Sequence, residues 1–90
     1  MLKQMAKCCC ICGRKLGIFG EERYKLTEEY IACYSCAPIF RKLKEFDDKK
    51  IIAKYEKELL DRLDENNASQ EVRNIVENEM ESIKYVKYES

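Results

Sequence analysis

The chain contains no histidine, which removes the side chain that enzymes use most often as a general base. Its Asp and Glu residues fall on the faces of expected helices and not around a recognisable pocket. Nothing in the sequence predicts a catalytic site, and we do not expect this protein to be an enzyme.

The chain also lacks a long apolar run. No stretch approaches the roughly 18 consecutive apolar residues of a membrane span, and residues 1–7 do not resemble a signal peptide. We therefore expect a cytoplasmic protein without a membrane partner. Because thiols stay reduced in the cytoplasm, closely spaced cysteines there bind metal more often than they form disulfides.

Neither sign of charge is in excess, because 17 Lys and Arg residues balance 17 Asp and Glu residues. Residues 1–44 carry nine basic and four acidic side chains, whereas residues 45–90 carry eight basic and thirteen acidic ones. The first half is basic and the second is acidic. This distribution differs from the strongly basic balance of a dedicated nucleic-acid binder.

What the sequence does have is six cysteines in 90 residues, and four of them form two Cys-x-x-Cys pairs. Cys9 and Cys12 form the first pair. Cys33 and Cys36 follow about 20 residues later, which is the spacing of a four-cysteine zinc site. We predict that these four residues bind one Zn²⁺ per chain. Because so short a chain buries little surface, the metal would contribute to its folding.

Cys8 and Cys10 offer no better pairing. Cys8 lies three residues from no other cysteine, and Cys10 is only two residues from Cys12. We interpret Cys8 and Cys10 as spare thiols beside the site. The alternative is a redox-sensitive role or a second metal.

The residues that flank the cysteines predict the parts of a treble clef, which are a knuckle, a β-hairpin and a helix. Gly13 supplies a backbone conformation that a residue with a Cβ resists, and backbone N–H groups after the first cysteine can donate to its sulfur. Residues 24–26 and 30–33 have the character of two strands joined by a polar turn. Cys36 then begins a helix with Pro38 in its first turn.

Two further features surround the expected metal. Arg14 and Lys15 place positive charge beside the dianionic centre. Ile18 and Phe19 belong to an apolar loop bounded by glycines. We expect this loop to fold back over the metal, with an exposed apolar patch as the alternative.

The pattern Cys-x-x-Cys-Gly-Arg-Lys-x-Gly, followed by a hairpin that ends in Ile-x-Cys-x-x-Cys and by a helix, resembles an uncharacterised family of bacterial treble-clef zinc modules. It is more loosely similar to the zinc-binding domain of the unfoldase ClpX, a dimer that docks adaptors. The resemblance covers residues 9–44 and is carried by Cys9, Cys12, Gly13, Cys33 and Cys36. The hairpin turn departs from the family, which commonly has Asp-Gly where this chain has Thr-Glu-Glu. The resemblance implies a fold and a metal, and no activity.

Residues 37–65 are helical in character, but their apolar face changes side along the helix. One side holds Ile39, Phe40, Leu43 and Phe46, and the roughly opposite side holds Ile51, Ile52, Tyr55, Leu59 and Leu63. We favour a break at Asp47 and Asp48, one of which would cap a second helix. The alternative is a single long helix that packs with both faces.

A second helix boundary follows. Asn66 or Asn67 can end the preceding helix, and Ser69 can cap the next. From residue 70 to about residue 84 the pattern is helical, with a narrow apolar stripe made of Val72, Ile75, Val76, Met80, Ile83 and Val86. The short linker predicts an antiparallel helical hairpin. Residues 85–90 would be a fraying end or a short strand.

We therefore predict a small α+β zinc module of the treble-clef type over residues 1–46, followed by an amphipathic α-helical hairpin over residues 47–90. A two-helix hairpin buries its apolar faces poorly alone. Either the zinc module or a second protein must cover them.

The expected function is that of a zinc-stabilised protein–protein interaction module, a small bacterial or phage adaptor, regulator or inhibitor. Its helical tail would mediate self-association, as a homodimer, or docking on another protein. A thiol redox protein is one alternative, since a Cys-x-x-Cys pair can also be redox-active. Weak nucleic-acid binding by the head is another, because tyrosines can stack on bases beside a basic face. The residues concerned are Tyr24, Tyr30, Tyr34, Arg14, Lys15, Arg23, Lys25, Arg41, Lys42 and Lys44.

Overall fold

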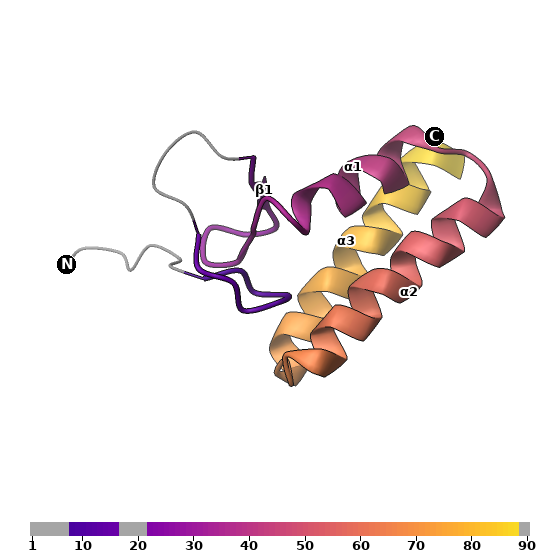
Figure 1. Ribbon diagram of the computed structural model, residues 1–90. Coiled ribbons are helices and arrows are strands. Elements are labelled where there is room, and N and C mark those ends of the chain that lie inside the picture. The colour runs from indigo at the N-terminus through magenta and orange to yellow at the C-terminus, as the bar shows by residue number, and fades with distance from the viewer. Residues whose placement is uncertain (1–7, 17–21, 89–90) are drawn as a thin grey trace.

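A computed structural model describes residues 8–16 and 22–88 (Figure 1). Within these residues lie two short strands and three helices: β1 (Tyr24–Lys25), β2 (Ile31–Ala32), α1 (Ala37–Glu45), α2 (Lys49–Glu65) and α3 (Gln70–Tyr88). The protein is thus a small α+β structure, as predicted. The expectations for residues 1–7 and for Ile18 and Phe19 lie outside the described residues. None of the helices in the described part of the chain is long and apolar enough to cross a membrane.

β1 and β2 form an antiparallel hairpin in which Tyr24 lies opposite Ala32. In the turn, Thr27 Oγ1 accepts hydrogen bonds from the backbone N–H groups of Glu29 and Tyr30, at 3.2 and 3.1 Å. The hydroxyl group stabilises the turn that the polar residues indicate. The predicted hairpin is confirmed, with regular pairing over two residues in each strand.

The break between α1 and α2 is also confirmed. α1 ends at Glu45, and Phe46 adopts an extended conformation with φ −92° and ψ 141°. Asp48 then caps α2, because its Oδ1 accepts a hydrogen bond from the Lys50 N–H at 2.8 Å. The change of direction allows the apolar faces of both helices to face the same core.

The turn between α2 and α3 follows the sequence signals. Asn66 is the C-cap of α2, and Asn67 adopts a left-handed conformation with φ +57°, which asparagine tolerates better than most residues. Ser69 Oγ accepts a hydrogen bond from the Val72 N–H at 3.3 Å at the start of α3.

The end of α3 differs from the prediction. The helix continues to Tyr88, so the expected fraying end or strand is wrong for residues 85–88. Lys84 binds Glu56 of α2 at 2.8 Å, which holds this part of α3 against its neighbour. Val86 does not belong to the buried stripe, because it is 63% exposed.

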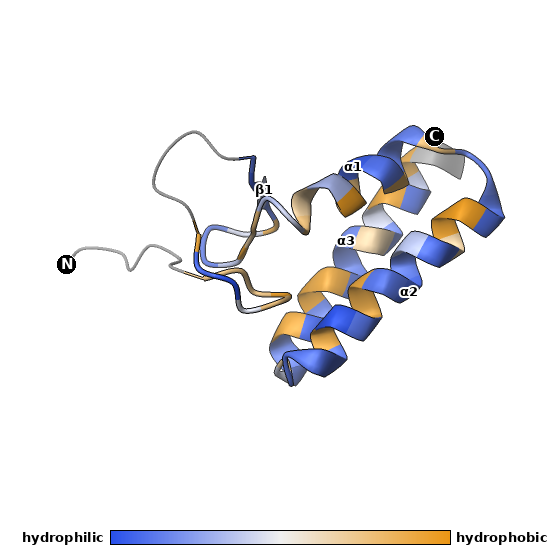
Figure 2. Ribbon diagram, in the orientation of Figure 1, coloured by the Kyte–Doolittle hydropathy of each residue, from blue (hydrophilic) through white to orange (hydrophobic). Residues whose placement is uncertain are grey.

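A single hydrophobic core joins the cysteine-bearing segment to the two long helices. α1 packs against both α2 and α3, and apolar residues are prominent along the helices (Figure 2). The core consists of Cys9, Ile11, Ala32, Cys33, Cys36, Ile39, Phe40, Leu43, Ile52, Leu59, Leu63, Val72, Val76, Met80 and Ile83. Most of the apolar surface of the helical hairpin is therefore covered by the rest of the chain, one of the two possibilities that the sequence left open, while Tyr85 and Val86 stay exposed.

The knuckle that carries the first two cysteines lies against the turn between α2 and α3 (Figure 1). Gly13 has φ +78°, and a Cβ built on it would lie 2.6 Å from Asn66 Oδ1. Ile11, beside it, is fully buried. The left-handed backbone conformation favours glycine at residue 13, and a larger residue would also require the Asn66 side chain to shift.

Candidate metal centre

The four predicted ligands come from two tight loops. In the first loop the Gly13 N–H donates to the Cys9 carbonyl oxygen at 3.0 Å, which brings Cys12 back toward Cys9. In the second, the Ala37 N–H donates to the Cys33 carbonyl oxygen at 2.7 Å as α1 begins. The Sγ atoms of all four cysteines lie within 4.8 Å of one another. The structure thus brings together the set that the spacing predicts.

The sulfurs lie close enough together to share one metal ion. Four thiolates about 2.3 Å from a Zn²⁺ ion are about 3.8 Å from one another. Here the Cys12 and Cys33 sulfurs are 3.5 Å apart, and no pair exceeds 4.8 Å. All six cysteines, each of which the structure describes, are free thiols. A group of four sulfurs is therefore placed to bind a metal ion.

The electrostatics of the group also favour a cation. Cys9, Cys33 and Cys36 are buried and Cys12 is partly buried. A hydrogen bond from the Cys36 thiol lowers the pKa of Cys9 to about 4, and the same contact followed by burial raises the pKa of Cys36. Burial also raises the pKa of Cys12. One thiolate is thus stabilised at the expense of its neighbours, and a bound divalent ion would allow all four to lose their protons.

Backbone donors support this charge. The Ile11 N–H points at Cys9 Sγ with a distance of 3.4 Å. Such hydrogen bonds spread the charge of a metal-bound thiolate and orient its sulfur. The sequence predicted a contact of this kind after the first cysteine.

Cys8 and Cys10 lie outside the four-sulfur group. Cys8 is exposed, and its backbone forms an isolated antiparallel bridge with Lys15. Cys10 is partly buried, and burial together with the nearby charge of Cys9 raises the pKa of its thiol to about 12. A thiol with so high a pKa stays protonated and is a poor nucleophile at neutral pH.

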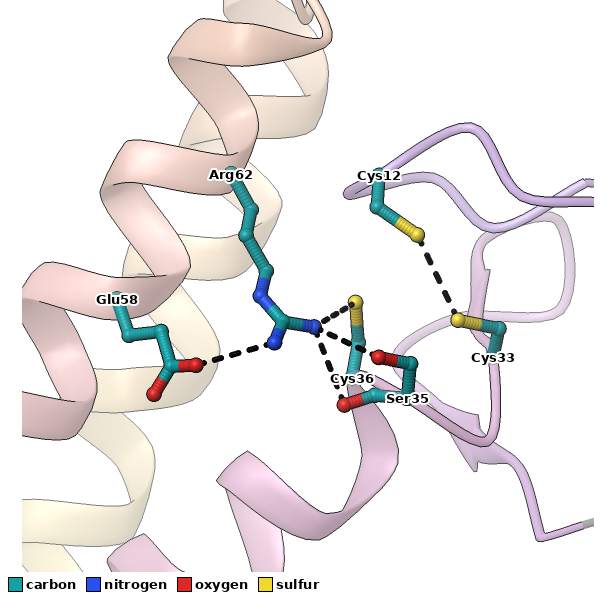
Figure 3. Close-up of polar contacts among 6 residues, drawn as sticks. All are labelled: Cys12, Cys33, Ser35, Cys36, Glu58 and Arg62. Atoms are coloured by element: carbon teal, nitrogen blue, oxygen red, sulfur yellow. Dashed lines mark hydrogen bonds and ion pairs between the residues drawn. The ribbon is translucent and has the colours of Figure 1, made fainter.

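Arg62 is a member of the site that the sequence did not reveal (Figure 3). Its Nη1 lies 3.3 Å from Cys36 Sγ and 3.1 Å from both the carbonyl oxygen and the Oγ of Ser35. Its Nη2 lies 3.0 Å from a carboxylate oxygen of Glu58, one turn earlier on α2. The spacing of Glu58 and Arg62 indicates an ion pair within the helix. No local signal indicates that the guanidinium also reaches Cys36, because that contact depends on tertiary packing.

Arg14, which was expected beside the centre, joins the two cysteine loops. It forms a hydrogen bond with the hydroxyl of Tyr34, and its guanidinium carbon lies 5.2 Å from the centre of that ring. Tyr34 stands between Cys33 and Cys36, so this exposed pair links the first loop to the second. The Lys15 side chain is exposed.

Several of the residues considered for nucleic-acid binding are engaged within the chain. Arg41 pairs with Glu22. Lys44 lies over the Tyr24 ring, with its Nζ 4.8 Å from the ring centre. The Tyr24 ring in turn stacks on Phe40 at 4.5 Å. These contacts use both the charge and the aromatic faces that nucleic acid would need.

A groove of about 380 Å³ lies between α1 and the last turns of α3. Polar and apolar side chains share its lining, which is formed by Lys44, Glu79, Ser82, Ile83 and Val86. Tyr85, next to it in sequence, is 65% exposed. The largest exposed apolar side chains in the described part of α3 are therefore at its C-terminal end.

Comparison of the chain with protein-family models, with curated proteins and with solved structures finds no match. The chemistry of this protein must be inferred from its own geometry, and its clearest feature is the four-sulfur group beside Arg62.

Proposed function

We propose that this chain is a zinc-stabilised protein–protein interaction module, with a treble-clef head and a helical tail that binds a second copy or another protein. Zinc is the proposed metal because four thiolates in a tetrahedral group are the usual ligands of structural Zn²⁺. A four-cysteine site occupies every coordination position of the ion. It stabilises a fold and offers no place for a substrate.

The observation that carries the interaction proposal is the surface at the end of α3. Tyr85 is 65% exposed there, and it precedes Val86, which lines the groove between α1 and α3. Tyrosine is enriched at the centres of protein interfaces because it combines a large apolar area with a polar tip. A groove whose lining combines Ile83 and Val86 with Lys44 and Glu79 suits a partner side chain of the same mixed character.

Native mass spectrometry of the protein, purified under reducing conditions, tests both parts of this proposal. We expect one Zn²⁺ per chain, and a dimer that Tyr85→Asp converts to a monomer without loss of zinc. The Leu60→Asp variant is the control and should remain a zinc-loaded dimer, because Leu60 is also an exposed apolar side chain but does not line the groove. A protein without zinc, whose mass is short by the hydrogens of disulfides, would overturn the metal assignment.

A zinc-loaded monomer would remove self-association and leave docking on another protein. In that case a photoreactive residue in place of Ser82 should cross-link to one defined protein in cell extract. The cross-link should disappear when Tyr85→Asp is added. A cross-link that persists in the Tyr85→Asp variant, or the absence of any cross-link, would contradict the proposed surface.

A further inference from the structure

We infer that Arg62 is an outer-sphere partner of the metal centre, and that through it metal binding and the docking of α2 form one coupled equilibrium. This inference rests on the metal part of the proposed function. It adds that the helical hairpin is not a passive appendage of the head, because one of its side chains contacts a ligand sulfur.

The contacts of Arg62 span two separate parts of the fold (Figure 3). On one side Nη1 donates to the segment that carries the second ligand pair, through Cys36 Sγ and both oxygens of Ser35. On the other side Nη2 is held by Glu58 of α2 at 3.0 Å. The guanidinium therefore has a fixed orientation, and the residue that fixes it is on α2. Its planar fork suits this double role better than a lysine ammonium.

The charges favour the contact when a metal is bound. Four thiolates around a divalent ion carry a net charge of −2, and Cys36 is fully buried. The Arg62 side chain is only 26% exposed. A cation this close to a buried anion interacts with it more strongly than a surface pair does, because solvent screens the interaction less. Charge-assisted donors of this kind stabilise metal-bound ligands.

The helical hairpin formed by α2 and α3 also contacts the first cysteine loop, which carries the other two sulfurs. The turn after α2 touches the first cysteine loop, where Asn66 approaches Gly13. The helical hairpin thus lies against both loops whose sulfurs a metal would join. Without the ion, the two loops meet at the sulfurs through thiol contacts, which are weaker than metal–thiolate bonds: the Cys12 and Cys33 sulfurs are 3.5 Å apart, and the Cys36 thiol donates to Cys9. The acceptors of Arg62 would then be held less firmly.

Coupling of this kind is reciprocal. If the docking of α2 raises the affinity for metal by some factor, bound metal must raise the equilibrium constant for α2 docking by the same factor. The inference therefore predicts two measurable effects of removing the Arg62 side chain. Metal binding becomes weaker, and bound metal stabilises α2 less than it does in the wild type.

Arg73 provides a matched control. Like Arg62, it pairs with a carboxylate (Asp64, 2.6 Å) and donates to a backbone carbonyl (Ala68, 3.1 Å). Its side chain is 28% exposed, close to the value for Arg62. It differs in that no contact of Arg73 in the described structure reaches a cysteine sulfur.

The test is competition for Zn²⁺ against a chromophoric chelator, with the wild type, Arg62→Met and Arg73→Met under reducing conditions. We expect Arg62→Met to weaken the apparent affinity about 10- to 100-fold, the usual effect of removing an outer-shell partner. Arg73→Met should leave the affinity unchanged, although both variants lose an ion pair. Equal affinities for the two variants would overturn the inference.

Amide hydrogen exchange with and without Zn²⁺ gives the reciprocal measurement. Zinc should slow exchange in α2 of the wild type, and this protection should shrink in Arg62→Met by a factor comparable to the loss in affinity. If zinc leaves α2 exchange unchanged in the wild type, the coupling does not exist.

Should Arg62→Met fail to fold, Glu58→Gln serves instead. It removes the negative charge that holds the guanidinium in place, without touching a sulfur or the core, and should weaken zinc binding in the same direction by a smaller factor. Unchanged affinity in Glu58→Gln would then count against the inference. A wild type that binds no zinc would instead refute the proposed metal, so the two failures are distinguishable.

Discussion

At the residue scale, two constraints coincide at Gly13, which has a left-handed backbone and lies against Asn66. We predict that Gly13→Ala lowers the free energy of unfolding by about 1–2 kcal/mol from the backbone alone, and by more because of the contact. Urea unfolding at a fixed concentration of free zinc measures the change.

The double variant with Asn66→Ala separates the two causes. It should restore the part of the free energy of unfolding that is lost through the contact with Asn66. The part lost through the left-handed backbone conformation should remain lost. Strict additivity of the two substitutions would show that the close approach has no energetic effect.

The hydroxyl group of Tyr24 should make the stability of the protein depend on pH in the alkaline range. Burial, followed by its hydrogen bond to Glu79, raises the pKa of the Tyr24 hydroxyl above its ordinary value. The native state therefore prefers the neutral phenol. Its contribution to stability is complete below pH of about 10 and is lost as the pH rises above that value. The free energy of unfolding should fall as the pH rises above about 10 toward the raised pKa of the native state, and Tyr24→Phe should make that fall shallower. Parallel curves for both proteins would contradict the assignment.

The grouping of the four cysteines was predictable from the sequence because Cys-x-x-Cys spacing is a local property of a tight turn. Gly13 and Ser69 were predictable for the same reason. Arg62 was not, since 26 residues separate it from Cys36 and nothing in its immediate sequence distinguishes it from other arginines in a helical ion pair. Residues that support a site from another element leave no signal in a single sequence.

At the element scale, the break before α2 depends on Asp48. We predict that Asp48→Ala lowers the free energy of unfolding by about 0.5–2 kcal/mol, because the Lys50 N–H loses its acceptor. Asp48→Asn should remain close to the wild type, since asparagine caps helices almost equally well. Thermal unfolding followed by circular dichroism compares the three proteins. An equal loss for alanine and asparagine would show that the charge matters and the cap does not.

Helix starts were easier to predict than the last helix end. The change of apolar face after Phe46 and the capping residues Asp48 and Ser69 marked where α2 and α3 begin. The end of α3 carried no such signal. The helix runs past Lys84 to Tyr88, and the ion pair between Lys84 and Glu56 of α2 is a contact between helices that local sequence does not reveal.

At the scale of the whole molecule, one core includes both the cysteines and the long helices. We predict that removal of zinc with a strong chelator, under reducing conditions, destabilises all three helices together and not the head alone. Far-ultraviolet circular dichroism should show one cooperative transition with zinc and a much lower melting temperature after chelation. Helices that keep their full melting temperature without metal would show that the hairpin folds independently.

The treble-clef assignment for the head and the partner of the tail remain proposals at this scale. The hairpin between the two cysteine pairs and the helix after the second pair have the expected order. How the apolar helices would be covered was beyond prediction, because either an intramolecular core or a partner satisfies the same pattern. The structure shows that the chain covers most of them itself.

The position of Arg62 in the chain has a consequence for synthesis on the ribosome. The fourth sulfur, Cys36, is translated 26 residues before the arginine that contacts it. At a usual elongation rate of about 5–20 residues per second, that interval lasts about 1–5 seconds. During this time a nascent chain holds all four thiols without the side chain that later supports them. Capture of the proposed metal can therefore precede docking of the helical hairpin, so that α2 and α3 would pack against a centre that already holds its ion.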